Sequence, residues 1–242
     1  MSAPATIVLR LDALVSAWRW LQAGVYRATF PVIPPSAAWG LVLNLAGIET
    51  RGSVAEVVTP IRPDVPSLEI AVGVQQAGQR SVLYQQLHGY PVGRAGAELK
   101  ARTFGNKYWI APAKREVLVG LIALVAARGA AEIIGRVTEG LAGRMAAPRY
   151  GLPFAGDNQC LFSRIDVVAA HEHARWYAPV AGSDLAPETT PLTTNIDRGD
   201  ASRTEAPLFA LTEQGPCPSR AWVRIGPWSG AALGRGVDAS GR

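Results

Sequence analysis

The sequence predicts an α+β protein whose elements follow the order β-α-β-β-α-β. Three observations predict this class: alternating residues typical of strands, two runs at helical spacing, and glycine- or proline-rich breaks between them. The chain has 242 residues, of which 48% are hydrophobic and 18% charged. It can therefore bury a sizeable core as one large domain or two small ones, and this composition argues against general disorder.

The first strand and the first helix are separated by two prolines. Residues 6–12 alternate between apolar and polar positions, with Ile7, Leu9 and Leu11 on one side, which predicts a strand. The Pro-Pro pair that follows stops the chain, and Ser36 is placed to cap a helix. Residues 37–46 are apolar nearly all round and end at a glycine, so we expect a buried helix.

Four more elements complete the order. Residues 68–74 alternate and predict a second strand, and the β-branched run at residues 117–125 favours a third. Residues 130–141 place apolar side chains at helical spacing with charged residues opposite, which predicts an amphipathic helix. After a glycine- and proline-rich loop at residues 148–156, residues 160–168 predict another strand.

This order is that of the ferredoxin-like (RRM-like) arrangement. Its second and third strands would be hairpin neighbours, so residues 80–114 become a long thumb hairpin at their tip, too long for an ordinary loop and therefore functional or structured. We expect residues 1–168 to form the ferredoxin-like body with this thumb. Residues 169–242 form a C-terminal extension that is partly irregular, acidic and strand-poor, with strand-like pieces at residues 208–212 and 221–225.

Positive charge is concentrated in the thumb. The net charge of the chain is +5, but residues 80–115 hold seven cations against one acid, whereas residues 180–215 hold six acids against two arginines. Only three of the 24 cations are lysine. Arginine suits bidentate contact with phosphate, although a GC-rich genome would give the same bias. The uneven charge favours one face that binds a polyanion.

The sequence predicts no metal site, no cofactor and no membrane span. Cys160 and Cys217 form no CxxC pair, and His171 with His173 lacks further ligands at a suitable spacing. The longest apolar run, residues 117–127, is about half of the ~20 residues that a span needs. The first residues lack the basic flank of a signal peptide, so we expect a cytoplasmic protein.

Four stretches of the chain carry a family resemblance. They are TFPVIPPSAAWGLVLNLAGIE (29–49), TFGNKYWIAPAKREVLVGL (103–121), PRYGLPFAGDNQCLFSRIDV (148–167) and TTNIDRGDASRTEAPLF (193–209). Together and in this order they resemble the CRISPR-associated Cas-five family, in its DevS-like branch. The resemblance implies a non-catalytic subunit of a type I CRISPR surveillance (Cascade) complex that binds and caps the 5′ handle of the crRNA. The implied partners are the crRNA, the backbone subunit, the large subunit and, through the complex, target DNA, for antiviral defence or RNA-guided DNA targeting.

The chemistry of the thumb and the glycine-rich loop agrees with this role. Single-stranded RNA is held by cations on its phosphates and by aromatic side chains under its bases, and glycine-rich backbone lets amides approach phosphate. The start of the first helix also offers amides to an anion. For one of the neighbouring residues Tyr108 and Trp109, the alternative role is packing in the core beside the strand. The predicted RNA-binding residues are Ser36, Arg80, Tyr84, Lys100, Arg102, Asn106, Lys107, Tyr108, Trp109, Lys114, Arg115, Arg149, Tyr150 and Gly151.

Two other functions remain open from the sequence. A metal-independent endoribonuclease that processes repeat RNA could use His88 as a general base, with Tyr84 or Lys107. A basic scaffold protein could use the thumb to bind the acidic face of another protein. For Arg115, the alternative to RNA binding is an ion pair with Glu116 or with another nearby acid. We expect a protein without enzymatic activity.

Overall fold

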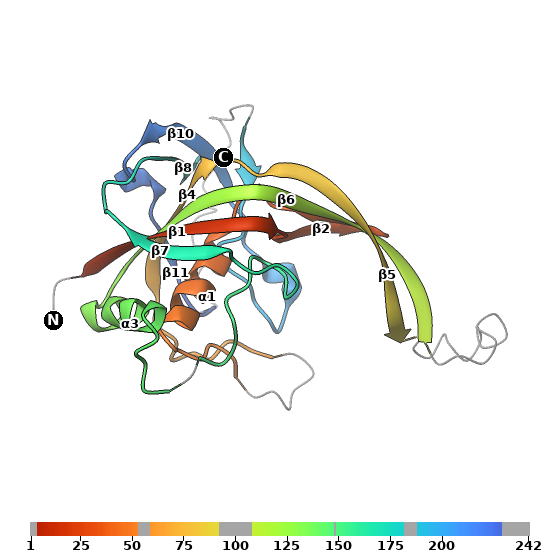
Figure 1. Cartoon of the computed structure of the whole chain (residues 1–242), viewed down its shortest axis with the longest axis horizontal. Coiled ribbons are helices and arrows are strands. Elements are labelled where there is room, and N and C mark those ends of the chain that lie inside the picture. Colours follow the sequence, from red (N-terminus) through yellow and green to blue (C-terminus); the bar gives the residue numbers. More distant parts are fainter. Residues whose placement is uncertain (1–3, 53–58, 92–107, 148, 182–187, 229–242) are drawn as a thin grey trace, which may run out of the picture.

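Strands dominate the structure, a computed structural model that describes residues 4–52, 59–91, 108–147, 149–181 and 188–228. Within these residues, eleven strands form one mixed sheet, and two helices pack beside each other against it (Figure 1). This confirms the predicted α+β class. The elements are β1 (Ala5–Ser16), β2 (Arg19–Ala23), β3 (Tyr26–Thr29), α1 (Pro35–Leu45), β4 (Leu68–Gln76), β5 (Gln79–Pro91), β6 (Tyr108–Gly129), α3 (Ala131–Leu141), β7 (Arg164–Val168), β8 (Ala174–Pro179), β9 (Thr190–Pro191), β10 (Leu208–Gly215) and β11 (Val223–Ile225).

The centre of the sheet has the order β7-β1-β6-β4, and every pair in it is antiparallel. Strands were predicted at residues 6–12, 68–74 and 117–125 and a helix at 130–141, and all four are confirmed within β1, β4, β6 and α3. The strand expected from residue 160 begins only at Arg164.

The alternation of β1 divides the core between the two faces of the sheet. Ile7, Leu9 and Leu11 are at most 5% exposed and pack in one cluster with α1 and α3. Val8 points to the opposite face and packs there with Leu124 and Trp176. Both faces are thus covered, so β1 and β6 lie in the interior and can hold a projecting element rigidly.

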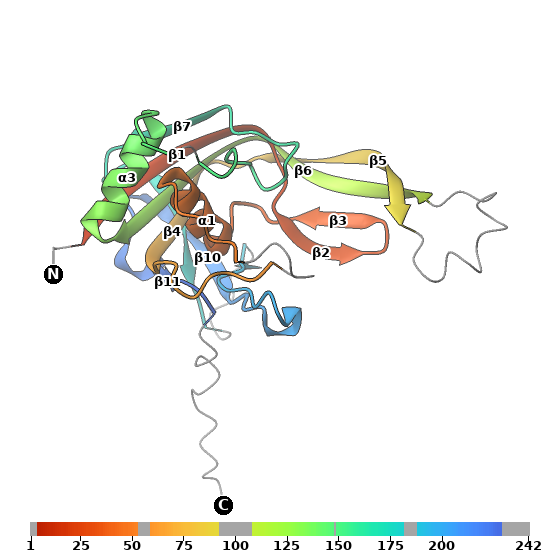
Figure 2. The ribbon, with the colours of Figure 1, turned by 90° about the horizontal axis from the view of Figure 1, so that it is seen from below.

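The projecting element is a hairpin of β5 and the outer half of β6 (Figures 1 and 2). The pairing runs from Gln79 opposite Val119 to Pro91 opposite Tyr108. A Cβ at Gly78 would lie 2.8 Å from that of Leu118, so the turn before β5 needs glycine to pass close to β6. The thumb expected at residues 80–114 therefore has two ordered strands as its base, and residues 92–107 lie outside the described part of the chain.

A second hairpin, β2–β3, was not predicted. It turns at Gly24, whose φ of 57° is the left-handed conformation that tight hairpin turns need. β3 then runs parallel to β6, with Tyr26 beside Lys114 and Arg27 beside Arg115. This hairpin therefore lies against the base of the thumb (Figure 2).

The prediction that Ser36 caps the first helix is wrong. Pro34 occupies the cap position without a side-chain hydrogen bond, and Pro35 begins the helix. Proline suits the first turn because its fixed φ is helical and no N–H is needed there. Ser36 is inside the helix, and its backbone N–H donates to the carbonyl of Thr193 at 3.0 Å.

The chain after Val168 contributes four strands, where a strand-poor extension was expected. The pieces predicted at residues 208–212 and 221–225 are confirmed as β10 and β11, whereas β8 and β9 were missed. β8 and β11 both pair with β4, so this region completes the sheet. The division into two parts at residue 168 stays a prediction.

Candidate nucleic-acid interface

Three arginines from three strands gather where the thumb leaves the body. Arg27 of β3 lies beside Arg115 of β6 in the sheet, and Arg19 of β2 lines the same small cleft. Arg19 is exposed and Arg27 is half-buried, and neither forms an ion pair with any residue that the structure describes. We call Arg19, Arg27 and Arg115 the arginine cluster.

Arg115 differs from Arg19 and Arg27 because it already forms an ion pair with an acidic residue. Its guanidinium forms an ion pair with Asp157, and both side chains are 17% exposed. Gln85 of the thumb donates to Gln159, two residues after Asp157, at 3.3 Å. These contacts connect the segment that follows the glycine-rich loop to the thumb. They fit the alternative in which Arg115 has a structural partner, an acid other than Glu116.

The glycine-rich loop depends on one glycine. At Gly156, φ is 90°, and a Cβ would lie 2.2 Å from the carbonyl oxygen of Ala17 and 2.8 Å from the ring of Trp18. Only glycine can occupy this position, because the conformation is left-handed and the space is already filled. The tight contact places Asp157, the next residue, beside Arg115.

The other face of the thumb base carries an exposed row of residues. Lys114 of β6 lies between Tyr84 of β5 and Tyr26 of β3, and paired residues of a sheet point to the same side. Tyr84 is 65% exposed and Tyr26 is 37% exposed, and Lys114 is also exposed. Lys114 forms no ion pair with a described residue. The Tyr84–Lys114–Tyr26 row thus offers a free cation between two aromatic rings.

Glu116 anchors this row to the body. The residue is 8% exposed, and its carboxylate accepts hydrogen bonds from the Thr29 N–H at 2.9 Å and the Tyr26 hydroxyl at 3.2 Å. It also forms an ion pair with Arg80 at 2.8 Å. Burial alone would raise the pKa of Glu116, but these contacts outweigh it and lower the pKa below its ordinary value. Arg80, predicted to bind RNA, is thus paired with an internal acid.

A pocket of about 540 Å³ shares Arg19 with the cleft of the arginine cluster. It is bounded by α1, by residues 193–196 and by the chain around Arg51. Ser36 lines it, as the sequence suggested for an anion site. The backbone amides that begin α1 are nevertheless used, because those of Ala37 and Ala38 both donate to Pro34 at 3.0 Å. The helix start therefore offers this pocket no free amide from these residues.

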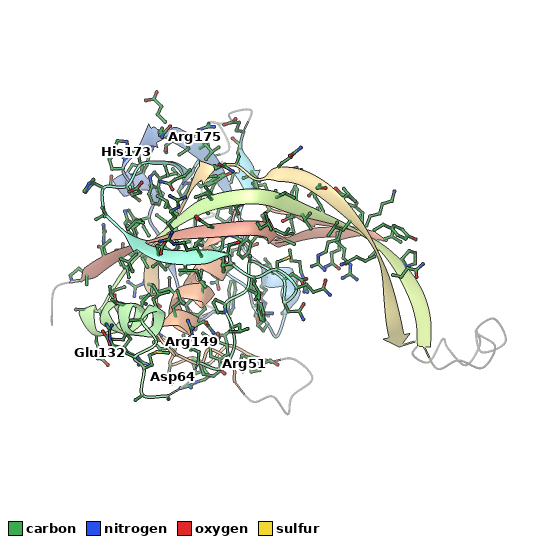
Figure 3. All side chains as sticks on the ribbon, viewed as in Figure 1. Arg51, Asp64, Glu132, Arg149, His173 and Arg175 are labelled. Carbon is green, nitrogen blue, oxygen red and sulfur yellow. The ribbon has the colours of Figure 1, made fainter. Side chains whose placement is uncertain are left out.

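The remaining predicted residues, Arg149, Tyr150 and Gly151, lie beside α1. The guanidinium of Arg51 stacks on the ring of Tyr150 at 5.0 Å, and Asn44 donates to the carbonyl of Gly151 at 3.2 Å. Figure 3 shows Arg51 and Arg149 at the same end of the molecule. This loop is thus joined to the wall of the pocket, because Arg51 lines it.

The structure brings some predicted residues together and leaves others untested. It places Tyr84 beside Lys114 and puts Arg115 in the arginine cluster, while Ser36 and the 149–151 loop lie at the pocket. Lys100, Arg102, Asn106 and Lys107 lie outside the described residues, as do the side chains of His88, Tyr108 and Trp109. The sequence reasoning missed five exposed or half-buried residues: Arg19, Tyr26, Arg27, Arg51 and Arg198.

For Arg19, Tyr26 and Arg27, the sequence did contain a local pattern. The stretch Arg19 to Arg27 has a glycine between two short runs that each contain an aromatic residue, Trp20 and Tyr26, which is compatible with a hairpin. For Arg51 and Arg198 no local pattern exists, because tertiary packing alone brings them to one pocket. Within the described residues, no cluster of three potential metal ligands is found, and no helix has the length and apolarity to span a membrane.

Comparison with known proteins adds evidence on the fold. No protein-family model and no curated protein matches the sequence. Among solved structures, the fold is similar to a chain of a "CRISPR RNA-guided surveillance complex", with a TM-score of 0.55 and 15% identity over 92% of this chain and 94% of that one. A chain described as "Crystal structure of Cas protein" gives a TM-score of 0.48 and 14% identity over 88% and 95%.

Proposed function

We propose that this protein is a non-catalytic subunit of a type I CRISPR surveillance (Cascade) complex, of the Cas-five family, that binds and caps the 5′ handle of the crRNA. In this role it joins the backbone subunit to the large subunit and acts on target DNA through the complex. The fold likeness to a surveillance-complex chain extends over 92% of the chain and supports this assignment. The β7-β1-β6-β4 order, with both helices packed in one core, supports a ferredoxin-like body.

The observation that carries the proposal is the placement of free cations and aromatic rings at the base of the thumb. Arg19 and Arg27 have no ion-pair partner among the described residues, and Lys114 stands between two exposed tyrosines on the other face. Cations on phosphates and rings under unstacked bases are the groups that hold single-stranded RNA. A strand bound here would follow the thumb outward from its base.

The roles of the residues follow from their partners. Arg19, Arg27 and Lys114 would contact phosphates, and Tyr84 would stack on a base. Arg80 and Arg115 would act mainly by fixing the thumb and the glycine-rich loop, because each is already paired with a carboxylate.

One experiment tests the function directly. The purified protein is incubated with labelled CRISPR-repeat RNA in EDTA and analysed on native and denaturing gels. We expect a shift on the native gel without cleavage on the denaturing gel. A discrete RNA product would instead indicate a metal-independent endoribonuclease, with His88 as its first candidate base. Neither shift nor product would favour a scaffold protein and overturn the proposal.

A further inference from the structure

The pocket beside α1 has an unusual charge for its size. Arg19, Arg51 and Arg198 line its wall, and no acidic side chain does so among the described residues. Arg51 is paired with Glu49 outside the lining, at 2.8 Å, so the free charges of the wall are those of Arg19 and Arg198. The two acids that follow Ile196, Asp197 and Asp200, pair with Arg203 and leave Arg198 free. Its volume of about 540 Å³ is within the range of about 300–1,000 Å³ typical of small-ligand sites.

The rest of the lining is apolar on one side and polar on the other. Trp18, Phe30 and Trp39 contribute rings, and Ser36 and Asn195 contribute a hydroxyl and an amide. Rings with a few polar groups and several guanidinium groups suit a planar, hydrogen-bonding and anionic ligand. A nucleotide has these three properties.

The pocket adjoins the arginine cluster through a shared residue. Arg19 lines both the pocket and the cleft that holds Arg27 and Arg115. Gly156 also lines the pocket, and its neighbour Asp157 is bound to Arg115. A strand that lies on the cluster can therefore place a residue in the pocket without leaving the protein surface.

We propose that this pocket holds one nucleotide of the bound strand, turned out from its neighbours. The base lies against the apolar side, and the two flanking phosphates lie at Arg19 and Arg198. Two phosphodiesters carry two negative charges, which match the two lining arginines that have no ion-pair partner among the described residues, since Arg51 is paired with Glu49. This inference rests on the proposed function and adds to it a specific subsite outside the thumb.

The first test is steric: a larger side chain is placed in the pocket, and all charges of the protein are kept. Gly40 lines the pocket in the middle of α1, and a Cβ there would meet nothing within 4 Å. Gly135 of α3 is the matched control, because its Cβ position is equally open and it lies away from the pocket. Leucine favours a helix more than glycine does, so neither Gly40→Leu nor Gly135→Leu should lower the melting temperature.

We expect Gly40→Leu to weaken binding of labelled repeat RNA at least tenfold and Gly135→Leu to change it less than twofold. A series of RNAs with one abasic nucleotide each identifies the bound position. At that position the missing base should weaken binding to the wild type and to Gly135→Leu, but should have no further effect on Gly40→Leu.

A second pair of variants tests the pocket by removing a surface charge, so that the conclusion does not depend on whether Gly40→Leu folds correctly. Arg198→Ala removes an exposed, unpaired pocket charge, and Arg220→Ala removes an exposed charge without a described ion pair elsewhere. Only the first should weaken RNA binding. If Gly40→Leu and Arg198→Ala bind RNA like the wild type, the subsite is wrong and the proposed function survives. A loss of partner-protein assembly with unchanged RNA affinity would also overturn the subsite, while a wild type that binds no RNA removes both proposals.

Discussion

Glu116 shows how one buried carboxylate can fix the geometry of the proposed RNA-binding surface. It receives a backbone N–H of β3, a tyrosine hydroxyl of β3 and an arginine of β5, although it belongs to β6. Three strands at the base of the thumb are thus tied to one side chain. The two aromatic rings and Lys114 on this face are held in register as a consequence.

Glu116→Gln should lower the free energy of unfolding at pH 7 by about 1–3 kcal/mol, because the Arg80 charge loses its partner. The pKa of Glu116 is lowered in the folded state, so its carboxylate stabilises the protein above the ordinary value of 4.5 and loses this effect as the pH falls through the lowered pKa. The difference between wild type and variant should therefore shrink in acid. Denaturant titrations at pH 7 and pH 3.5 measure it, with the exposed Glu213→Gln as control. A constant difference at both pH values would contradict the argument.

Arg115 and Lys114 are neighbours in sequence with opposite expected effects. Arg115→Ala leaves Asp157 half-buried and unpaired, so we expect a loss of about 1.5–3 kcal/mol of stability, and Asp157→Ala should cost a similar amount. The double variant should cost less than the sum of the two. Lys114→Ala should leave the melting temperature unchanged and weaken RNA binding. Thermal melts and RNA titrations on the four variants would refute this if the two single losses were simply additive.

At the scale of elements, the β2–β3 hairpin adds cations that the thumb does not contain. If Arg19 and Arg27 each contact a phosphate, the slope of log affinity against log salt should become less negative by about 0.7 for each arginine removed. Arg19→Ala and Arg27→Ala test this by RNA titration at several salt concentrations. Arg220→Ala, an exposed arginine away from the cluster, serves as control. An unchanged slope in both variants would exclude this hairpin from the interface.

The thumb can be shortened at a defined place. Gln85 and Ala113 are opposite each other in the β5–β6 pairing, so a two-residue Asn-Gly turn can join them in place of residues 86–112. This keeps both the Arg80–Glu116 and the Arg115–Asp157 pair, whereas a cut of residues 80–114 would remove Arg80. We expect an unchanged melting temperature and a large loss of RNA affinity. A shortened protein that no longer melts cooperatively would show that the thumb belongs to the core.

For the whole molecule, the sequence predicted elements with strong local patterns and missed those that depend on distant partners. The alternation of β1 and the helical spacing of α3 are visible within a dozen residues. The Arg115–Asp157 pair and the pocket around Arg198 are not, because they join segments that only the completed sheet brings together. The capping role predicted for Ser36 was wrong for a local reason. Serine is a good capping residue in isolation, but Pro35 had already begun the helix.

The C-terminal strands contribute to the stability of the whole sheet. Trp176 of β8 is 1% exposed and packs directly on Gly73 of β4, where a Cβ would lie 2.9 Å from its ring. Its indole N–H donates to the Gly215 carbonyl at 3.0 Å. Trp176→Ala should therefore cost about 3–5 kcal/mol of stability. The control Trp222→Ala removes a half-buried ring that stacks on Arg128 at 4.2 Å, and its cost should be smaller.

A fragment that ends at Val168 tests the contribution of all the C-terminal strands together. It would lose β8 and β11 and so expose one edge of β4, and it would also lose Trp176 and the fully buried Phe209. An exposed strand edge and an uncovered apolar face favour aggregation. We expect this fragment to be insoluble or to lack a cooperative thermal transition by circular dichroism. A soluble fragment that melts at the temperature of the whole chain would instead establish residues 1–168 as an independent domain, with the later strands only docked on its edge.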